Sequence, residues 1–288
     1  MKTHELARLS ARVALYALSA ALALFFLAPI LFMVVSSFKP ERVIFSDLAS
    51  LWRAFLPTTF SPVNYAYVFG RVPIARYFFN SLFVAGTAVS IGLLLNGMLA
   101  FTLARLDWPL RRTVLLVVVA LSIVPLETVA VPMLVMVNSF PWLDGSTSWL
   151  DTYRVQILPF ASDAFSVFLF YQFFIGLPKE LDEAAKIDGC TPLRTYFRII
   201  APLSSSAFAT AAILNALMLW NSYLWPLMAT RSESVRPLPI GITALFVLNM
   251  QWGHVLAFAS LITVPVIVVF LLCQRWFVAG MASTGIKG

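Results

Sequence analysis

Long stretches without charged side chains are the feature that most constrains the fold of this 288-residue chain. Six segments carry no charge or a single acidic residue, and each is long enough for a transmembrane helix, which needs roughly 20 apolar residues. Charged residues make up only 11% of the chain, against about a quarter in a typical soluble domain. The sequence therefore predicts six membrane spans at about residues 13–37, 77–104, 113–137, 157–177, 203–229 and 255–274.

The spans are predicted to be α-helices. Only helices and closed barrels satisfy all backbone polar groups in lipid, and these segments lack the alternating pattern of barrel strands. The first span is longer than the apolar region of a cleavable signal peptide, so we expect it to be retained. We expect an all-α integral membrane protein whose residues 1–288 form a single transmembrane domain.

The basic residues predict the orientation of the chain. Its formal charge is +7, and 12 of the 20 Lys and Arg residues lie in residues 1–12, 105–112, 178–198 and 275–288. Because cytoplasmic loops are enriched in Lys and Arg, these segments are predicted to face the cytoplasm, as are both termini. Lipid headgroups account for the basic excess, and no nucleic-acid partner is expected.

The sequence lacks the motifs that mark metal binding, ATP binding and hydrolytic catalysis. The chain has two cysteines and two histidines, and no grouping of them suggests a metal site. It contains no Gly-rich phosphate-binding loop followed by Lys and Ser or Thr, so ATP would have to bind to another protein. Motifs for serine hydrolases and zinc proteases are also missing. We therefore expect neither an enzyme nor a cofactor in this chain.

Residues 178–202, between the fourth and fifth spans, have the pattern of a helical hairpin. Pro178 suits the first turn of a helix, and the acidic residues that follow suit its positive end. Gly189 is predicted to end this helix in the left-handed conformation, and Thr191 with Pro192 is predicted to start a second helix. From this pattern alone, a plain connector is as good an interpretation as a docking element.

The same segment resembles the cytoplasmic signature of bacterial ABC-importer permeases. That signature reads Glu-Ala-Ala, three residues, Gly, nine residues, Ile, one residue and Leu-Pro; this chain has Ala201 in place of Leu. Shorter similarities occur at residues 80–82, 220–227, 277–280 and 287–288, and they resemble the second permease of maltose-type or glycerol-phosphate systems. The residues that would couple to an ATPase are Glu183, Ala184, Ala185, Asp188, Gly189, Ile199 and Pro202.

The resemblance implies a mechanism and a set of partners. A second permease would complete a heterodimer in the bacterial inner membrane, and two ATPase subunits would bind ATP and Mg beneath it. The short helix that ends at Gly189 would dock on one ATPase. An extracytoplasmic binding protein would deliver the solute, which alternating access would move inward.

Polar and aromatic residues inside the spans are candidates for the solute pathway. Glu127 is an intramembrane carboxyl group, which is a functional-site hypothesis by default, although a packing or capping role is an open alternative. Asn96 and Asn215 are more typical of hydrogen bonds between helices. Trp225 would suit either a sugar face or the membrane interface. The candidate pathway residues are Glu127, Gln172, Trp220, Asn221 and Tyr223.

The predicted function is that of a permease subunit importing a sugar, oligosaccharide or polyol. Glycerol 3-phosphate or a glycerophosphodiester is the alternative solute. An ion-coupled secondary transporter is the rival class, but such proteins usually have relays of ionisable residues within the membrane.

Overall fold

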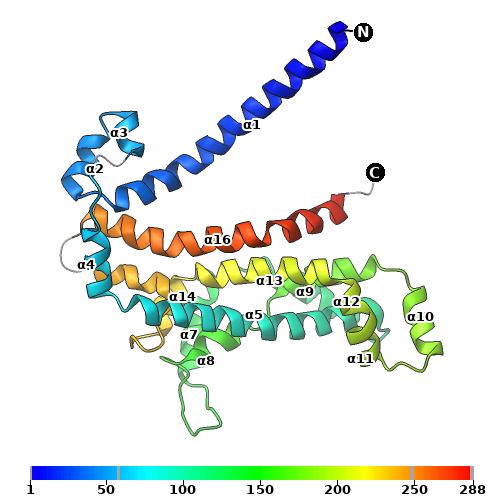
Figure 1. Ribbon diagram of the computed structural model, residues 1–288. Coiled ribbons are helices and arrows are strands. Elements are labelled where there is room, and N and C mark those ends of the chain that lie inside the picture. Colours follow the sequence, from blue (N-terminus) through cyan, green and yellow to red (C-terminus); the bar gives the residue numbers. More distant parts are fainter. Residues whose placement is uncertain (1, 57–58, 247–249, 286–288) are drawn as a thin grey trace. The chain divides into compact units, whose positions relative to one another are not determined.

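The computed structural model describes residues 2–56, 59–246 and 250–285, with the backbone alone for residues 2–10 and 273–285. Every regular element in these ranges is helical, as the sequence predicted (Figure 1). The chain divides into two compact units. The first comprises residues 1–73 and 242–265, and the second comprises residues 74–241 and 266–288. The similarities at residues 277–280 and 287–288 lie outside the side chains that are described.

The first unit combines a long N-terminal helix with a lobe of short helices. Helix α1 is apolar enough to cross a membrane from Ala11 to Ser37. The unit also contains α15 and the first part of α16. The bounds of its helices are α1 Lys2–Ser37, α2 Glu41–Asp47, α3 Leu51–Phe55, α4 Val63–Arg71, α15 Thr243–Phe246 and α16 Trp252–Gly285.

A buried lysine organises the lobe of the first unit. The side chain of Lys39 is 1% exposed, and its Nζ lies 3.1 Å from an Asp47 carboxyl oxygen. The same Nζ donates hydrogen bonds to the carbonyl oxygens of Arg53 at 2.6 Å and Ala54 at 3.2 Å. A buried charge is tolerated only when it is paired and hydrogen-bonded, and Lys39 meets both conditions.

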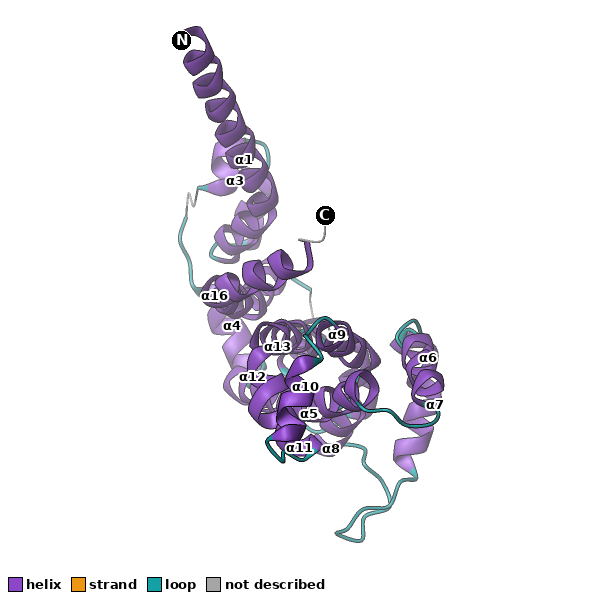
Figure 2. Cartoon of the chain, turned by 90° about the vertical axis from the view of Figure 1, so that its right-hand side faces the viewer, coloured by secondary structure: helices purple, strands orange, loops and turns teal. Residues whose placement is uncertain are grey.

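Three helices form the centre of the second unit. Helices α5 (Ile74–Arg105), α9 (Ala164–Ile175) and α13 (Ser205–Trp220) pack against one another, and Figure 2 views them nearly end on. Phe101, Phe170 and Tyr196 are among the aromatic residues buried in their core. The remaining elements are α6 Arg111–Leu121, α7 Leu126–Asn138, α8 Tyr153–Ile157, η1 Leu158–Phe160, α10 Glu180–Ile187, α11 Pro192–Thr195, η2 Tyr196–Ile200, α12 Ala201–Leu203, α14 Leu224–Ala229 and η3 Leu238–Ile242.

Four helical segments of the described residues are long and apolar enough to cross a membrane. They are Ala11–Ser37, Ile74–Arg105, Tyr153–Ile175 and Trp252–Leu272, and each overlaps one predicted span. Two further helix pairs pass the same test together but are sharply bent, by 105° between α6 and α7 and by 80° between α12 and α13. By length and composition, the described residues therefore contain four candidate spans, or up to six if each bent pair is one span.

A proline lies at or next to each of the two bends. Between α6 and α7, Pro125 lies in extended backbone at the N-cap of α7, where a continuous helix would need a helical residue. In the second pair, Pro202 has no N–H to donate within the helix, and α12 ends one residue later. The predicted span 203–229 is interrupted again at residues 221–223, before α14.

Candidate functional site

Helix α10 lies in the first half of loop 178–202, which leads from α9 toward α13. It runs from Glu180 to Ile187, with Glu180, Asp182 and Glu183 in its first turn. Acidic residues there interact favourably with the positive end of the helix dipole. Pro178 precedes the helix rather than occupying its first turn, because Lys179 is the N-cap. This placement corrects one detail of the sequence-based prediction.

Gly189 ends α10 in the left-handed conformation that the sequence predicted, with φ +71°. The N–H of Cys190 donates to the Ala185 carbonyl at 2.8 Å, and the N–H of Gly189 donates to the Lys186 carbonyl at 3.0 Å. This pair of bonds is the Schellman motif, which satisfies the free carbonyl groups at a helix end. A Cβ at Gly189 would meet no atom within 4 Å, so the requirement for glycine comes from the backbone.

A second capped helix follows immediately. The side chain of Thr191 accepts a hydrogen bond from the N–H of Arg194, and Pro192 occupies the first helical turn, as predicted. The chain then passes through the π turn at Tyr196–Ile200 into the bent pair that contains α13. In this passage Ile199 is half-buried and Pro202 is exposed. Loop 178–202 is therefore a defined helix–turn–helix structure.

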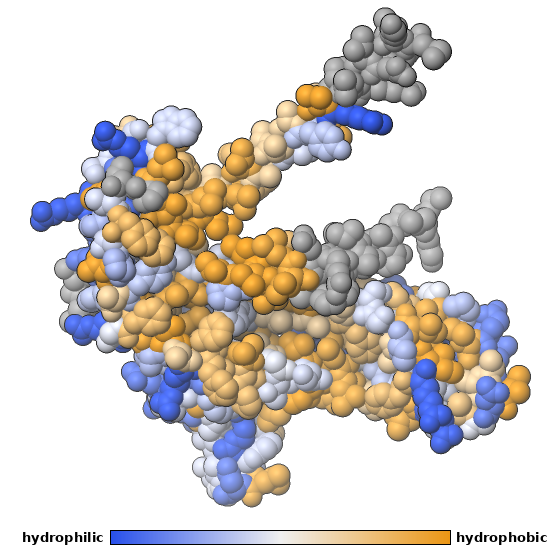
Figure 3. All heavy atoms as spheres, viewed as in Figure 1, coloured by the Kyte–Doolittle hydropathy of each residue, from blue (hydrophilic) through white to orange (hydrophobic). Residues whose placement is uncertain are grey.

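Only some of the residues that were predicted to contact an ATPase are exposed on the surface of this chain. Glu183, Ala184 and Asp188 are exposed, and the side chain of Ile187 is 87% exposed. Ala185 is only 1% exposed, so it packs inside this chain and does not belong to the outward surface. At the end of the second unit that contains α10, hydrophilic and hydrophobic side chains are interspersed on the surface (Figure 3).

An intramembrane polar cluster joins the three central helices. Asp163 caps α9, and its Oδ1 accepts a 2.7 Å hydrogen bond from the N–H of Ser166. Its Oδ2 accepts bonds from the side-chain amides of Asn96 on α5, at 3.1 Å, and Asn215 on α13, at 3.3 Å. Asn96 and Asn215 thus serve as links between helices. The three-helix role of Asp163 was missed, because its position near the start of a predicted span gave no sign of its partners.

The break before α9 explains why this cluster is needed. A helix start inside a membrane leaves N–H groups that no water can satisfy. Asp163 takes the Ser166 N–H, and the Asn96 side-chain oxygen accepts from the backbone N–H of Asp163 at 3.3 Å. Gly92 lets this break approach α5, since a Cβ there would lie 3.1 Å from the Ala161 carbonyl oxygen.

The candidate pathway residues lie on three elements. Glu127 is exposed in the first turn of α7, just after the bend. Gln172 is exposed on α9, and Asn221 and Tyr223 are exposed at the α13–α14 junction. Trp220 is half-buried, and its ring meets that of Phe78 edge-on at 5.5 Å.

Trp225 has neither of the roles that its sequence context suggested. Its side chain is 1% exposed, and its Nε1–H donates to the Val155 carbonyl at 2.8 Å. It packs with Val137 and Ala229 in a small core. Trp225 therefore joins α14 to α7 and α8, and it is available to neither a sugar nor the membrane interface.

A carboxyl clasp fixes the loop that follows α14. Asp151 Oδ1 accepts from the backbone N–H groups of Arg231 and Ser232, both at 2.8 Å, and from the Ser232 hydroxyl at 3.0 Å. Desolvation by burial raises the pKa of Asp151, but the bonds from the Ser232 and Arg231 N–H groups outweigh it and hold the pKa below its usual value.

The clasp is expected to open only in acid. A carboxyl group whose pKa is lowered in the folded state contributes stability above its unfolded pKa, about 3.9 for Asp, and loses it as the pH falls through the folded pKa. Backbone amides of Arg231 and Ser232 should therefore resist hydrogen exchange at neutral pH and lose this protection only below about pH 4. Asparagine tolerates the φ of +58° at position 151, so Asp151→Asn should keep the local conformation. In this variant, the protection of the two amides should no longer depend on pH. Equal pH dependence in both proteins would assign the effect to another group.

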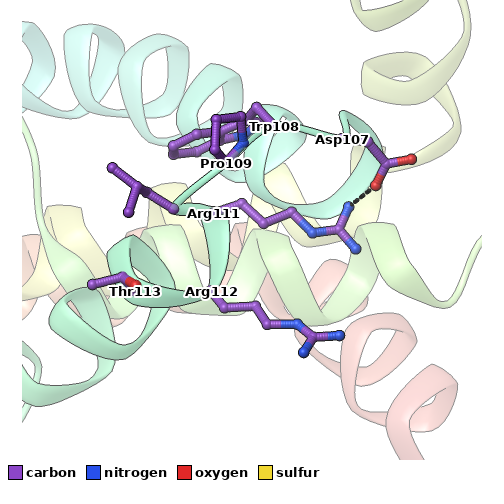
Figure 4. Close-up of a pocket in the computed structure, with 7 residues that line it drawn as sticks. Asp107, Trp108, Pro109, Arg111, Arg112 and Thr113 are labelled. Carbon is purple, nitrogen blue, oxygen red and sulfur yellow. Dashed lines mark hydrogen bonds and ion pairs between the residues drawn. The ribbon is translucent and has the colours of Figure 1, made fainter.

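A surface hollow of about 550 Å³ lies at the turn between α5 and α6. Residues 107–113 line it, and Figure 4 shows the ion pair between Asp107 and Arg111 at its edge. One short stretch of chain forms this hollow, and no residue of loop 178–202 or of the intramembrane cluster lines it. Among the described residues, no group of three or more His, Cys, Asp or Glu side chains could hold a metal ion.

Apolar helices joined by an intramembrane polar cluster, with a capped helix projecting beyond them, define the class as a multi-pass helical membrane protein. Within this class, the chain belongs to the family of inner-membrane components of binding-protein-dependent transport systems. The family model matches residues 88–283, which include loop 178–202 and all the candidate pathway residues.

Individual relatives extend the similarity over most of the chain. It is 32% identical over 262 residues to the arabinooligosaccharides transport system permease protein AraQ of Halalkalibacterium halodurans, covering 90% of this chain and 91% of that protein. The diacetylchitobiose uptake system permease protein NgcG of Streptomyces coelicolor is also 32% identical, covering 90% and 83%. The sn-glycerol-3-phosphate transport system permease protein UgpE of Yersinia enterocolitica is 30% identical, covering 88% and 85%.

A solved structure has the same fold. The crystal structure of a bacterial ABC transporter involved in the import of the acidic polysaccharide alginate contains a chain that superposes with a TM-score of 0.76. The superposition covers 92% of this chain and 95% of that one at 21% sequence identity. The likeness supports the helical arrangement described above.

Proposed function

We propose that this chain is one of two permease subunits of an ATP-driven importer for a carbohydrate-type solute. It would cross the inner membrane six times, with both bent pairs counted as spans and both termini in the cytoplasm. A second permease, two ATPase subunits that bind ATP and Mg, and an extracytoplasmic binding protein would complete the importer. Membership of the binding-protein-dependent family supports this set of partners.

The observation that best supports the proposal is the outward surface of α10. A short helix held at both ends, with Glu183, Ala184 and Ile187 exposed, suits insertion into a groove of a partner. Ile187 is a large apolar side chain that a partner would cover favourably. Gly189 and Asp188 would set the direction of the helix, and Ile199 and Pro202 would transmit its movement to α13.

The solute is proposed to be a sugar, oligosaccharide or polyol. The named solutes of two relatives, arabinooligosaccharides and diacetylchitobiose, support this class. The relative in glycerol 3-phosphate transport supports the alternative of a phosphorylated polyol. Binding of labelled members of both classes to the partner binding protein would separate them.

The test of this function is reconstitution with and without the ATPase. We expect no ATP turnover by the purified chain and turnover that the loaded binding protein stimulates once the second permease and the ATPase have assembled with it. Turnover by the isolated, uncontaminated chain would contradict the proposal. Failure of the ATPase to co-purify with the permease pair would contradict the docking role of α10.

Glu127, Gln172, Trp220, Asn221 and Tyr223 are proposed to contribute to the solute pathway. Glu127 is the strongest member, because carboxyl oxygens accept hydrogen bonds from sugar hydroxyls and the residue is exposed beside a bend inside the predicted membrane region. Glu127→Gln should lower the rate of solute uptake several-fold while the importer assembles normally. The reason is the loss of a charge-assisted hydrogen bond, which contributes about 1 kcal/mol or more to solute binding. Uptake kinetics in membrane vesicles measure this, and unchanged kinetics would assign Glu127 a structural role.

A further inference from the structure

Arg105, the last residue of α5, reaches across to the beginning of loop 178–202. Its Nη1 lies 2.7 Å from an Asp182 carboxyl oxygen and 3.4 Å from the Pro178 carbonyl oxygen. Its Nη2 donates to the Leu177 carbonyl at 2.9 Å. The side chain of Arg105 is only 4% exposed, and that of Asp182 is 18% exposed. This contact was not predicted, because sequence reasoning treated Arg105 only as the boundary of the second span.

The chemistry of the contact requires arginine. A guanidinium group presents several N–H donors in a planar fork, whereas a lysine ammonium group is a compact point charge. The fork of Arg105 serves two backbone carbonyls and one carboxyl oxygen at once. Two of these acceptors lie in the connection from α9 to α10, and Asp182 lies in the first turn of α10. Arg105 therefore ties the end of one span to the base of the projecting helix.

We propose that Arg105 is a positioning residue that transmits the movement of α10 to α5, an inference that rests on the proposed docking of α10 on an ATPase. The chain itself joins α10 only to α9 and, through the Gly189 turn, to α11. The Arg105–Asp182 ion pair adds a direct link to α5, the longest helix of the second unit. Because α5 packs on α9 and α13, a displacement of α10 moves the three central helices together.

The polar cluster supports this transmission. Nine residues before Arg105, Asn96 binds Asp163 at the start of α9, and Asp163 also binds Asn215 on α13. The three central helices are thus tied together within the predicted membrane region, and the ion pair ties α10 to one end of α5. Without the ion pair, α10 is free to tilt against the end of α5 while the bundle stays in place.

The test compares ATP turnover with solute uptake in the reconstituted importer. In Arg105→Gln, we expect ATPase co-purification and ATP turnover to persist while solute uptake per ATP falls about tenfold, within the usual range of coupling between sites. In Arg105→Lys, solute uptake per ATP should lie between the values for the unchanged protein and for Arg105→Gln, because lysine keeps the positive charge but lacks the planar fork of donors. Arg112→Gln is the matched control: it removes an exposed arginine from the first turn of the adjacent helix α6, and the ratio of solute uptake to ATP turnover should not change.

Asp182→Asn keeps the test decisive if Arg105→Gln does not assemble. It removes the ion pair and leaves both carbonyl contacts of Arg105 in place, so it should lower the uptake-to-ATP ratio with normal assembly. A normal ratio in an assembled Arg105→Gln or Asp182→Asn importer would overturn the proposal. Absence of ATPase binding by the unchanged protein would instead refute the docking role of α10, so the two failures are distinguishable.

Discussion

Gly189→Val is expected to disconnect the permease from its ATPase while the membrane helices still fold. A β-branched residue at φ +71° costs about 1–3 kcal/mol of backbone strain, which the loop relieves by leaving the left-handed conformation. The hydrogen bonds from Cys190 to Ala185 and from Gly189 to Lys186 would then be lost, and α10 would change direction. Pull-down of the ATPase should fall about tenfold or more, since 1.4 kcal/mol corresponds to a factor of ten.

Gly189→Asn is the matched control for this prediction. Asparagine adopts the left-handed conformation more readily than other residues with a side chain, and a Cβ meets no atom within 4 Å here. Assembly and coupling should be nearly normal in Gly189→Asn and lost in Gly189→Val. If both variants assemble and couple normally, loop 178–202 is only a connector. Ala185→Trp would be a poor probe, because Ala185 is buried within this chain.

Asp163→Leu is expected to be the most damaging single change within the membrane helices. It removes the acceptor of three hydrogen bonds, from Ser166, Asn96 and Asn215, and no water is at hand inside a bilayer to replace it. Loss of an N-cap costs about 0.5–2 kcal/mol, and each unsatisfied buried donor adds about 1–3 kcal/mol. The yield of folded protein from membranes and its melting temperature in detergent should both fall.

Asp163→Asn separates the hydrogen-bonding role from any role of charge. Its side-chain oxygen can still cap α9, but its amide nitrogen takes the place of Oδ2 and cannot accept from Asn96 and Asn215. Asp163→Asn should therefore recover the part of the stability that the cap contributes. Uptake should persist as well. Loss of uptake by a well-folded Asp163→Asn importer would instead indicate that transport requires the acid itself, as in an ion-coupled mechanism.

The overall fold was largely predictable from the chain's apolar runs. Four predicted spans each overlap one long apolar helical segment, because a run of roughly 20 uncharged residues has few alternatives to a membrane helix. The sequence did not predict how sharply the chain bends at residues 122–125 and at Ser204. Proline marks both regions, but whether a proline kinks a membrane helix or breaks it depends on the tertiary contacts that satisfy the freed backbone groups.

The candidate site was predictable in its local parts. The left-handed Gly189 and the Thr191 cap depend on neighbouring residues alone, so sequence sufficed. Contacts between distant segments were not predictable. Arg105 and Asp182 are separated by 77 positions and Asn96 and Asp163 by 67, and nothing in one sequence pairs them. The inward direction of Ala185 and the exposure of Glu127 likewise depend on how the helices pack.

Uptake into proteoliposomes tests the central claim most directly. The chain is reconstituted with its second permease and ATPase, ATP is enclosed, and the binding protein is added outside with labelled oligosaccharides or glycerol 3-phosphate. We predict uptake only when all four proteins and ATP are present, and none when a proton or sodium gradient replaces ATP. Gradient-driven uptake by the chain alone, without ATP or ATPase, would contradict its assignment as a permease subunit of an ATP-driven importer.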